Sequence, residues 1–196
     1  MHPLSTMARP KSEEKRQHLL HAAAEAIAQR GVGAPTAMIS SMAGVAEGTL
    51  FRYFPNKEAL FNELYLYLFE NMCASLAEAL DLSQPLAQRA QGQWNAYIDW
   101  GIAHPVWYKA INQLAVTDIL TAQTREKELS LFPDVALVEA GTKGELFGHL
   151  NPDFSDAVFL AIAAATLAFV AREPARAEEY KLSGFKAYAR VFLPNA

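Results

Sequence analysis

The feature that most constrains this chain is a single glycine between two short segments with helical apolar spacing, within residues 36–60. Gly44 stands where the chain must turn sharply, and glycine takes left-handed or tight conformations at little steric cost. Ile39, Val45 and Leu50 have the spacing that lets two short helices pack across each other at a steep angle. We therefore predict a helix after Thr36, a tight turn, and a second helix over residues 47–54. An ordinary helical hairpin of a bundle is the alternative.

The sequence on both sides of this segment carries a family pattern. Upstream stands KRQHLLHAAAEAIAQRG and downstream FPNKEALFNELYLYL. Together with AGVAEGTLFRYF, these residues closely resemble the N-terminal domain of the TetR family of transcriptional regulators, over about residues 9–70. Three departures concern individual contacts: Ala46 replaces a usual capping Ser, Phe51 replaces a common Tyr, and Ser40 and Met42 replace alanines.

The resemblance implies that the helix over residues 47–54 enters the major groove while flanking residues hold phosphates. By position, Thr36, Tyr53 and Lys57 correspond to phosphate contacts. Thr49 and Arg52 are implied contacts to base edges or adjacent phosphates, and Glu47 is a candidate acceptor from cytosine. The expected DNA-binding residues are Arg9, Lys11, Thr36, Glu47, Gly48, Thr49, Arg52, Tyr53 and Lys57. Of these, Arg9 and Lys11 form a basic arm for which plain solvation is an equal alternative, whereas Phe51 and Phe54 are expected in the core.

Charge is divided unevenly along the chain, whose net charge is −4. Residues 1–57 hold seven Lys and Arg against four acids, whereas residues 58–196 hold ten basic and seventeen acidic residues. A basic head on an acidic body suits a protein of which only one end meets phosphates. Together with this charge division, the resemblance implies a helix-turn-helix DNA-binding domain over residues 1–57 and a ligand-binding and dimerisation domain over residues 58–196.

Apolar spacing follows helical periods throughout, without strand-like alternation. The predicted fold is all-α with about nine helices: a three-helix DNA-binding module, a long fourth helix capped by Asn56, and a helical body. The helices are expected over about residues 12–29, 36–43, 47–54, 56–80, 86–103, 106–114, 117–141, 151–172 and 177–192. We expect Thr36 and Thr117 to cap the helices that follow them and residues 142–150 to form a loop.

The helix expected over residues 151–172 is apolar all the way round, so it needs cover on every side. The resemblance implies that the last two helices form a two-fold, four-helix interface with a second chain; full burial within one chain is the alternative. A homodimer would place two reading helices on the half-sites of a palindromic DNA operator. The expected interface residues are Phe159, Ile162, Ala163, Leu167, Phe185, Tyr188 and Phe192.

Aromatic residues are frequent in the body, where the resemblance implies a cavity for an unknown small-molecule effector. The candidate cavity residues are Trp94, Tyr97, Trp100, Trp107, Tyr108, Phe147 and Phe169, with plain helix packing as the alternative. The implied function is a transcriptional repressor that its ligand releases from DNA. Activation, control by a protein partner, and regulation without an effector are the alternatives.

Catalysis, metal binding and cofactors are not expected. The five histidines lack metal-site spacing, and no serine or cysteine lies in a nucleophile motif. The single cysteine, Cys73, fits a reducing cytoplasm and the role of a small apolar filler, with redox sensing as the alternative. No signal peptide is visible, and the apolar stretch 157–171 is shorter than the ~20 residues of a membrane span. We expect a cytoplasmic protein without a membrane partner.

Overall fold

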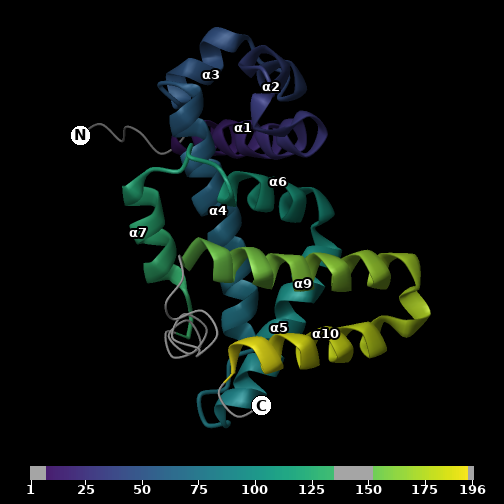
Figure 1. Ribbon diagram of the computed structural model, residues 1–196. Coiled ribbons are helices and arrows are strands. Elements are labelled where there is room, and N and C mark those ends of the chain that lie inside the picture. The colour runs from purple at the N-terminus through teal and green to yellow at the C-terminus, as the bar shows by residue number, and fades with distance from the viewer. Residues whose placement is uncertain (1–7, 135–151, 194–196) are drawn as a thin grey trace. The chain divides into compact units, whose positions relative to one another are not determined.

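The computed structural model describes residues 8–134 and 152–193, with side chains described from residues 13 and 154 onward in these two ranges. The described residues form nine α-helices and no β-strand, which confirms the predicted all-α fold (Figure 1). Phe147 and the loop predicted over residues 142–150 lie outside this description. The helices are α1 (Ala8–Arg30), α2 (Thr36–Met42), α3 (Glu47–Tyr53), α4 (Lys57–Glu78), α5 (Leu86–Ala103), α6 (Pro105–Ala115), α7 (Ala122–Leu131), α9 (Pro152–Arg172) and α10 (Ala177–Phe192).

The chain divides into two compact units that are not continuous in sequence. The first unit contains the described residues up to Phe69 together with Val106–Glu128. The second unit contains Glu70–Pro105 and the described residues from Leu129 onward. The first unit therefore extends beyond residue 57 and takes in α6. The functional division into residues 1–57 and 58–196 stays a prediction.

In the first unit, α1, α2 and α3 lie together at the N-terminal end of α4 (Figure 1). These helices contact one another through aliphatic side chains that recur at helical spacing in the sequence. Leu19 and Ile27 of α1, Ile39 of α2, Leu50 of α3 and Leu60 of α4 are each fully buried. Burial of such a side chain stabilises the fold by about 1.5–3 kcal/mol relative to leaving it in water. This core holds the two short helices in the predicted helix-turn-helix.

Two glycines and one helix cap have the effect on the backbone that the sequence predicts. Gly44 has a φ of 67° in the turn between α2 and α3, where a side chain would be strained. Gly31 has a φ of 73° directly after α1 and ends that helix. The Asn56 side chain caps α4, because its Oδ1 accepts a hydrogen bond from the Ala59 amide at 2.7 Å.

Two predicted caps and one predicted core residue are wrong. Thr36 is the first residue of α2, and its N-cap is Pro35, without a side-chain hydrogen bond. The Thr117 hydroxyl donates back to the Leu114 carbonyl at 2.7 Å, and α7 begins only at Ala122. Phe51 is 44% exposed, because α3 turns it away from the core that holds Phe54.

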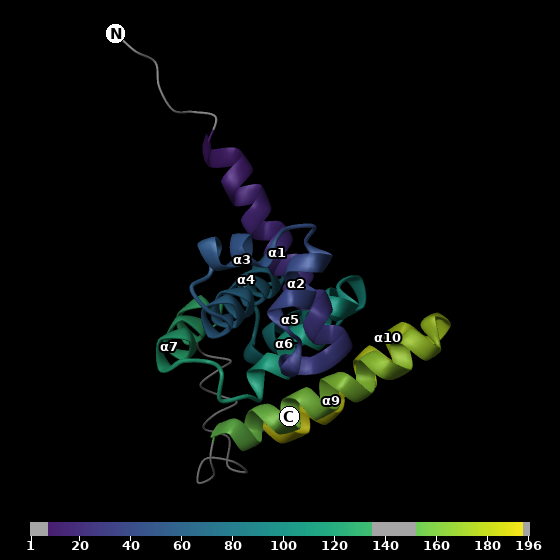
Figure 2. The same ribbon diagram turned by 90° about the horizontal axis from the view of Figure 1, so that it is seen from above.

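In the second unit, α9 and α10 pack against each other; they run side by side in Figure 1 and overlap in the view of Figure 2. Gly184 allows this close approach, since a Cβ there would collide with the Thr166 hydroxyl of α9 and lie 2.7 Å from Trp94 of α5. The Trp94 indole nitrogen donates to the Lys181 carbonyl at 3.0 Å. The ring centroids of Trp94 and Tyr188 lie 5.6 Å apart. An aromatic layer therefore joins α5 to the last helix pair.

Candidate nucleic-acid interface

Helix α3 buries Leu50 and leaves its other residues exposed or half-buried. Arg52 is exposed, and Thr49 and Tyr53 are half-buried. A Cβ placed on Gly48 would meet nothing within 4 Å, so packing inside the chain does not require glycine there. The surface of α3 is therefore accessible and mostly polar, with Phe51 as an exposed apolar residue. Because Gly48 has no side chain, the edge of a DNA groove can approach the backbone there.

The first residues of α2 and α3 are joined by a hydrogen bond. The Thr36 hydroxyl donates to Oε1 of Glu47 at 2.6 Å, and Glu47 itself is exposed. Because Glu47 stands in the first turn of α3, its negative charge is favourable to the helix dipole. It also compensates in part for Ala46, which occupies the N-cap of α3 without a side-chain hydrogen bond. Two predicted DNA-binding residues are thus brought into direct contact.

Lys57 is the first residue of α4 and half-buried. A cation at a helix N-terminus is electrostatically unfavourable. Its Nζ lies 5.2 Å from the centroid of the Phe61 ring, a cation–π contact that offsets part of this cost. The side chain is held near the start of α4, where the resemblance implies a phosphate contact.

The other basic groups near the N-terminus differ in their surroundings. Arg9 and Lys11 lie in the first turn of α1, and their side chains are outside the description. Arg16 forms ion pairs with Glu63 and, at 3.4 Å, with Glu13. Burial raises the pKa of Glu63, and the guanidinium of Arg16 opposes this rise. Arg16 is thus paired with two carboxylates of the first unit.

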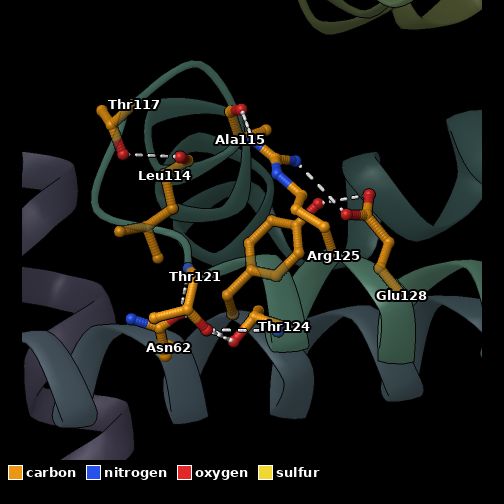
Figure 3. A network of polar contacts seen from close by, with 9 residues as sticks. Asn62, Leu114, Ala115, Thr117, Thr121, Thr124, Arg125 and Glu128 are labelled. Carbon is orange, nitrogen blue, oxygen red and sulfur yellow. Dashed lines mark hydrogen bonds and ion pairs between the residues drawn. The ribbon is translucent and has the colours of Figure 1, made fainter.

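A polar network that the sequence analysis missed fixes the second turn of α4 (Figure 3). Asn62 is buried, and its amide nitrogen donates to the carbonyls of Glu58 at 2.8 Å and Ile119 at 2.9 Å. Its Oδ1 accepts from the Thr121 amide at 2.8 Å and from the Thr124 hydroxyl at 2.7 Å. The side chain therefore uses all four of its hydrogen-bonding positions. This ties α4, just after Lys57, to the start of α7.

One turn further along α4, a second set of contacts reaches α7 (Figure 3). The buried Tyr65 hydroxyl donates to Oε1 of Glu128 at 2.6 Å. Arg125 donates to the other oxygen of Glu128 at 3.2 Å and also to the Ala115 carbonyl. Its guanidinium lies 5.8 Å from the Tyr65 ring centroid. Sequence reasoning offered no signal for the contact between Tyr65 and Glu128, because these residues are 63 positions apart in the chain.

A further cluster in the first unit joins α1, α4 and α6. A ring nitrogen of His21 lies 2.9 Å from the Tyr67 hydroxyl. The His21 ring centroid is 5.4 Å from that of Trp107. Burial lowers the pKa of His21, and nearby His18 adds to this effect. Both histidines line an open cavity of about 340 Å³ that also includes Glu25. Within the described part of the chain, no group of three His, Cys, Asp or Glu residues has a metal-binding arrangement.

The residues predicted to line a ligand cavity fall into both units. Trp94, Tyr97 and Trp100 of α5 are buried in the second unit. Trp107 and Tyr108 of α6 are half-buried and belong to the first unit. Phe169 of α9 is 42% exposed and faces Tyr180, with ring centroids 5.4 Å apart. The role of these residues in ligand binding stays a prediction.

The residues predicted at the dimer interface are largely covered within one chain. Ala163, Leu167, Phe185 and Phe192 are buried, and Phe159, Ile162 and Tyr188 are half-buried. The exposed side of α9 consists of other residues, which recur every three or four positions: Phe154, Ala157, Ala161, Ala164 and Ala168. Only 28% of the most apolar 18-residue stretch of α9 is buried. This helix is long and apolar enough to cross a membrane, but the core helices of soluble proteins meet the same criterion.

The all-α fold, the Gly44 turn and the outward-facing α3 define a helix-turn-helix DNA-binding protein. The family model for bacterial regulatory proteins of the tetR family matches residues 19–64, which run from the middle of α1 to the first turns of α4. This match is to the DNA-binding part of the TetR family of transcriptional regulators, a class of proteins that are not enzymes.

Relatives and solved structures agree with this assignment. The chain is 25% identical over 153 residues to the uncharacterized HTH-type transcriptional regulator YhgD of Bacillus subtilis (strain 168), covering 76% of this chain and 80% of that protein. A tetR family transcription regulator from Shewanella sp. PV-4 matches with a TM-score of 0.70 and 21% identity, over 89% of this chain and 95% of that one. LfrR from Mycobacterium smegmatis, in complex with proflavine, matches with a TM-score of 0.61 and 17% identity, over 93% and 99%. The last two similarities concern the fold alone.

Proposed function

We propose that this regulator acts in the cytoplasm as a homodimeric repressor, which binds a palindromic operator through residues 1–57 and is released by a small molecule held in the body. The observation that carries the proposal is α3, which buries one residue and exposes a polar face beside the start of α2. The excess of basic residues in this part of the chain supports binding to phosphates.

In this proposal, Thr36, Tyr53 and Lys57 hold phosphates on either side of the groove that α3 enters. Thr49 and Arg52 read the base edges. Arg52 suits a guanine, because a guanidinium donates to O6 and N7 together. Phosphate contacts set the position of the head on the duplex, and base contacts set the sequence that it prefers. Arg9 and Lys11 reach phosphates next to the site.

Two alanine variants separate these roles. Arg52→Ala is expected to weaken operator binding by about 1–3 kcal/mol and to relax the preference at one base pair. Lys57→Ala is expected to weaken binding to all sequences about equally and to reduce the salt slope by about one phosphate contact. The control is Lys186→Ala, which removes an exposed charge from α10. Binding is measured on operator selected from a random pool, at matched salt. Wild-type affinity in both head variants would refute the contact assignments.

The exposed side of α9 supports the dimer. Its small residues allow a second helix to approach closely, and Phe154 adds a large apolar surface that is 51% exposed in one chain. Ala161→Glu places a charge in the middle of this face and is expected to yield monomers that bind operator weakly. Ala74→Glu introduces the same charge at an exposed position of α4 and serves as the control. Molar mass from light scattering reports the outcome; a dimeric Ala161→Glu variant would exclude this face.

The aromatic layer of the second unit supports an aromatic or lipophilic effector. The Trp94, Tyr97 and Phe159 rings lie within about 6 Å of one another or of Tyr188. LfrR, which shares the fold, was solved with the planar aromatic compound proflavine. Effector binding releases DNA only if the ligand binds more tightly to one particular conformation of the dimer. In that conformation the two DNA-binding domains do not match the spacing of the grooves. Thermal shifts over a compound panel, beside operator release by the same compounds, test this; a ligand that strengthens DNA binding would contradict release.

A further inference from the structure

The hydrogen bond between Thr36 and Glu47 limits what each residue can do on DNA. A threonine hydroxyl has one donor hydrogen. In the free protein this hydrogen is directed to Oε1 of Glu47 at 2.6 Å. A phosphate oxygen that binds the Thr36 hydroxyl must therefore displace the carboxylate of Glu47. The two acceptors compete for the same hydrogen.

The competition also has an electrostatic part. Glu47 is the only acid in α3, and it is exposed at the helix start, beside the hydroxyl that would meet a phosphate. A carboxylate that stays there repels the incoming phosphate. A charge-assisted hydrogen bond of this length is also stronger than a neutral one. The carboxylate of Glu47 therefore disfavours binding in which Thr36 contacts only the DNA backbone, although the surrounding surface is basic.

We propose that Glu47 is a specificity-determining residue that acts by an exchange of hydrogen-bond partners. Its carboxylate releases the Thr36 hydroxyl to a phosphate only where a base edge offers an amino group that the carboxylate can accept from instead. In the major groove the fitting donor is N4 of cytosine. On a duplex without this donor, the exchange leaves the carboxylate unpaired next to a phosphate, so binding is penalised. This inference rests on the proposed DNA-binding function and adds a mechanism by which nonspecific sites are rejected.

The test compares wild type with Glu47→Gln on two duplexes, the operator that wild type selects from a random pool and a scrambled duplex of equal composition. Glutamine keeps the size and an acceptor oxygen but removes the charge. Glu14→Gln removes a charge from an exposed position of α1 and is the matched control. Thr36→Val, alone and combined with Glu47→Gln, removes the hydroxyl for which the two acceptors compete. Circular dichroism verifies that each variant is folded.

Glu47→Gln is expected to bind the scrambled duplex about three- to tenfold more tightly, the factor for removing a unit charge about 5 Å from a phosphate in a solvent-exposed site. The salt slope on that duplex should steepen by about 0.9, the value of one phosphate contact. Operator affinity should stay equal or fall, so that discrimination drops, chiefly at one cytosine-bearing base pair in each half-site. In the Thr36→Val background this gain should be clearly smaller, because no hydroxyl is left for the two acceptors to compete for and only the repulsion between the carboxylate and the phosphate is relieved.

Two failures are distinguishable. If wild type binds no duplex at low ionic strength, the proposed function and this mechanism both fail. If wild type selects an operator but Glu47→Gln changes its affinity for the operator and the scrambled duplex by the same factor, or changes neither, the exchange mechanism alone is refuted. A gain on the scrambled duplex that is as large in the Thr36→Val background as with Thr36 present would equally overturn it.

Discussion

Replacing Asn62 by aspartate changes one atom of the network that joins α4 to α7. Wild-type Nδ2 donates to the Glu58 and Ile119 carbonyls at 2.8 and 2.9 Å, and Oδ1 accepts from Thr121 and Thr124. Aspartate keeps the shape and the acceptor. It places its second oxygen, without a hydrogen, against two carbonyl oxygens.

The cost follows from these contacts. Two hydrogen bonds are lost, at about 1 kcal/mol each, and a charged oxygen is held against carbonyls in a buried position. A total of about 3–5 kcal/mol is expected at neutral pH. Burial and the two carbonyls raise the pKa of the new carboxyl in the folded state above its unfolded value. The folded variant then binds a proton that the unfolded chain releases, so its deficit in unfolding free energy shrinks as the pH falls.

Urea denaturation, followed by circular dichroism and tryptophan fluorescence, measures both effects. The control is Asn71→Asp, because exposed Asn71 only accepts there, from the Trp100 indole nitrogen at 2.8 Å. The control should lose less than about 1 kcal/mol. Equal denaturation midpoints for the two variants, or a deficit of Asn62→Asp that does not change with pH, would refute this account of the network.

Three further predictions concern stability. Gly184→Ala is expected to destabilise the protein by about 1–3 kcal/mol, since its Cβ meets the Thr166 hydroxyl; thermal melting checks this, and an unchanged midpoint would show that α10 shifts freely. Asn56→Ala removes the α4 cap and should cost about 0.5–2 kcal/mol in urea titrations, with a smaller loss for Asn56→Ser, which can still cap. Because the pKa of His21 is lowered in the folded state, the unfolded chain takes up its proton first, and stability falls as the pH drops through 6.5 and below. In His21→Gln, which keeps a partner for Tyr67, this fall in the unfolding free energy should be smaller; an identical pH profile would exclude the role of His21.

Features that depend on neighbouring residues could be predicted from the sequence. The Gly44 turn, the Asn56 cap and the helix after Pro152 all follow from local chemistry and helical spacing, and the structure confirms each. Most of the exposed face of α3 was predictable for the same reason, from the helical spacing around buried Leu50; Phe51, which was expected in the core, is exposed instead.

Features that depend on distant partners could not be predicted in this way. The Thr36 hydroxyl was expected to cap α2, but Thr36 lies inside the helix and its hydroxyl bonds Glu47, eleven residues away. Asn62 resembles any polar residue of a helix until the start of α7 is placed against it. Aromatic content alone also did not show that Trp94 and Trp107 belong to different compact units.

The discontinuity of the first unit has a consequence for the order in which the protein matures. A nascent chain presents α1, α2 and α3 before α6 exists, yet Trp107 and Gln113 of α6 lie against His21 and Gly31 at the side of α1. Those surfaces stay open to water while α5 is still being translated, and closing the intervening loop costs entropy before the contacts form. The helices α1, α2 and α3 are thus made first, but the first unit to which they belong is complete only after the ribosome has passed residue 128.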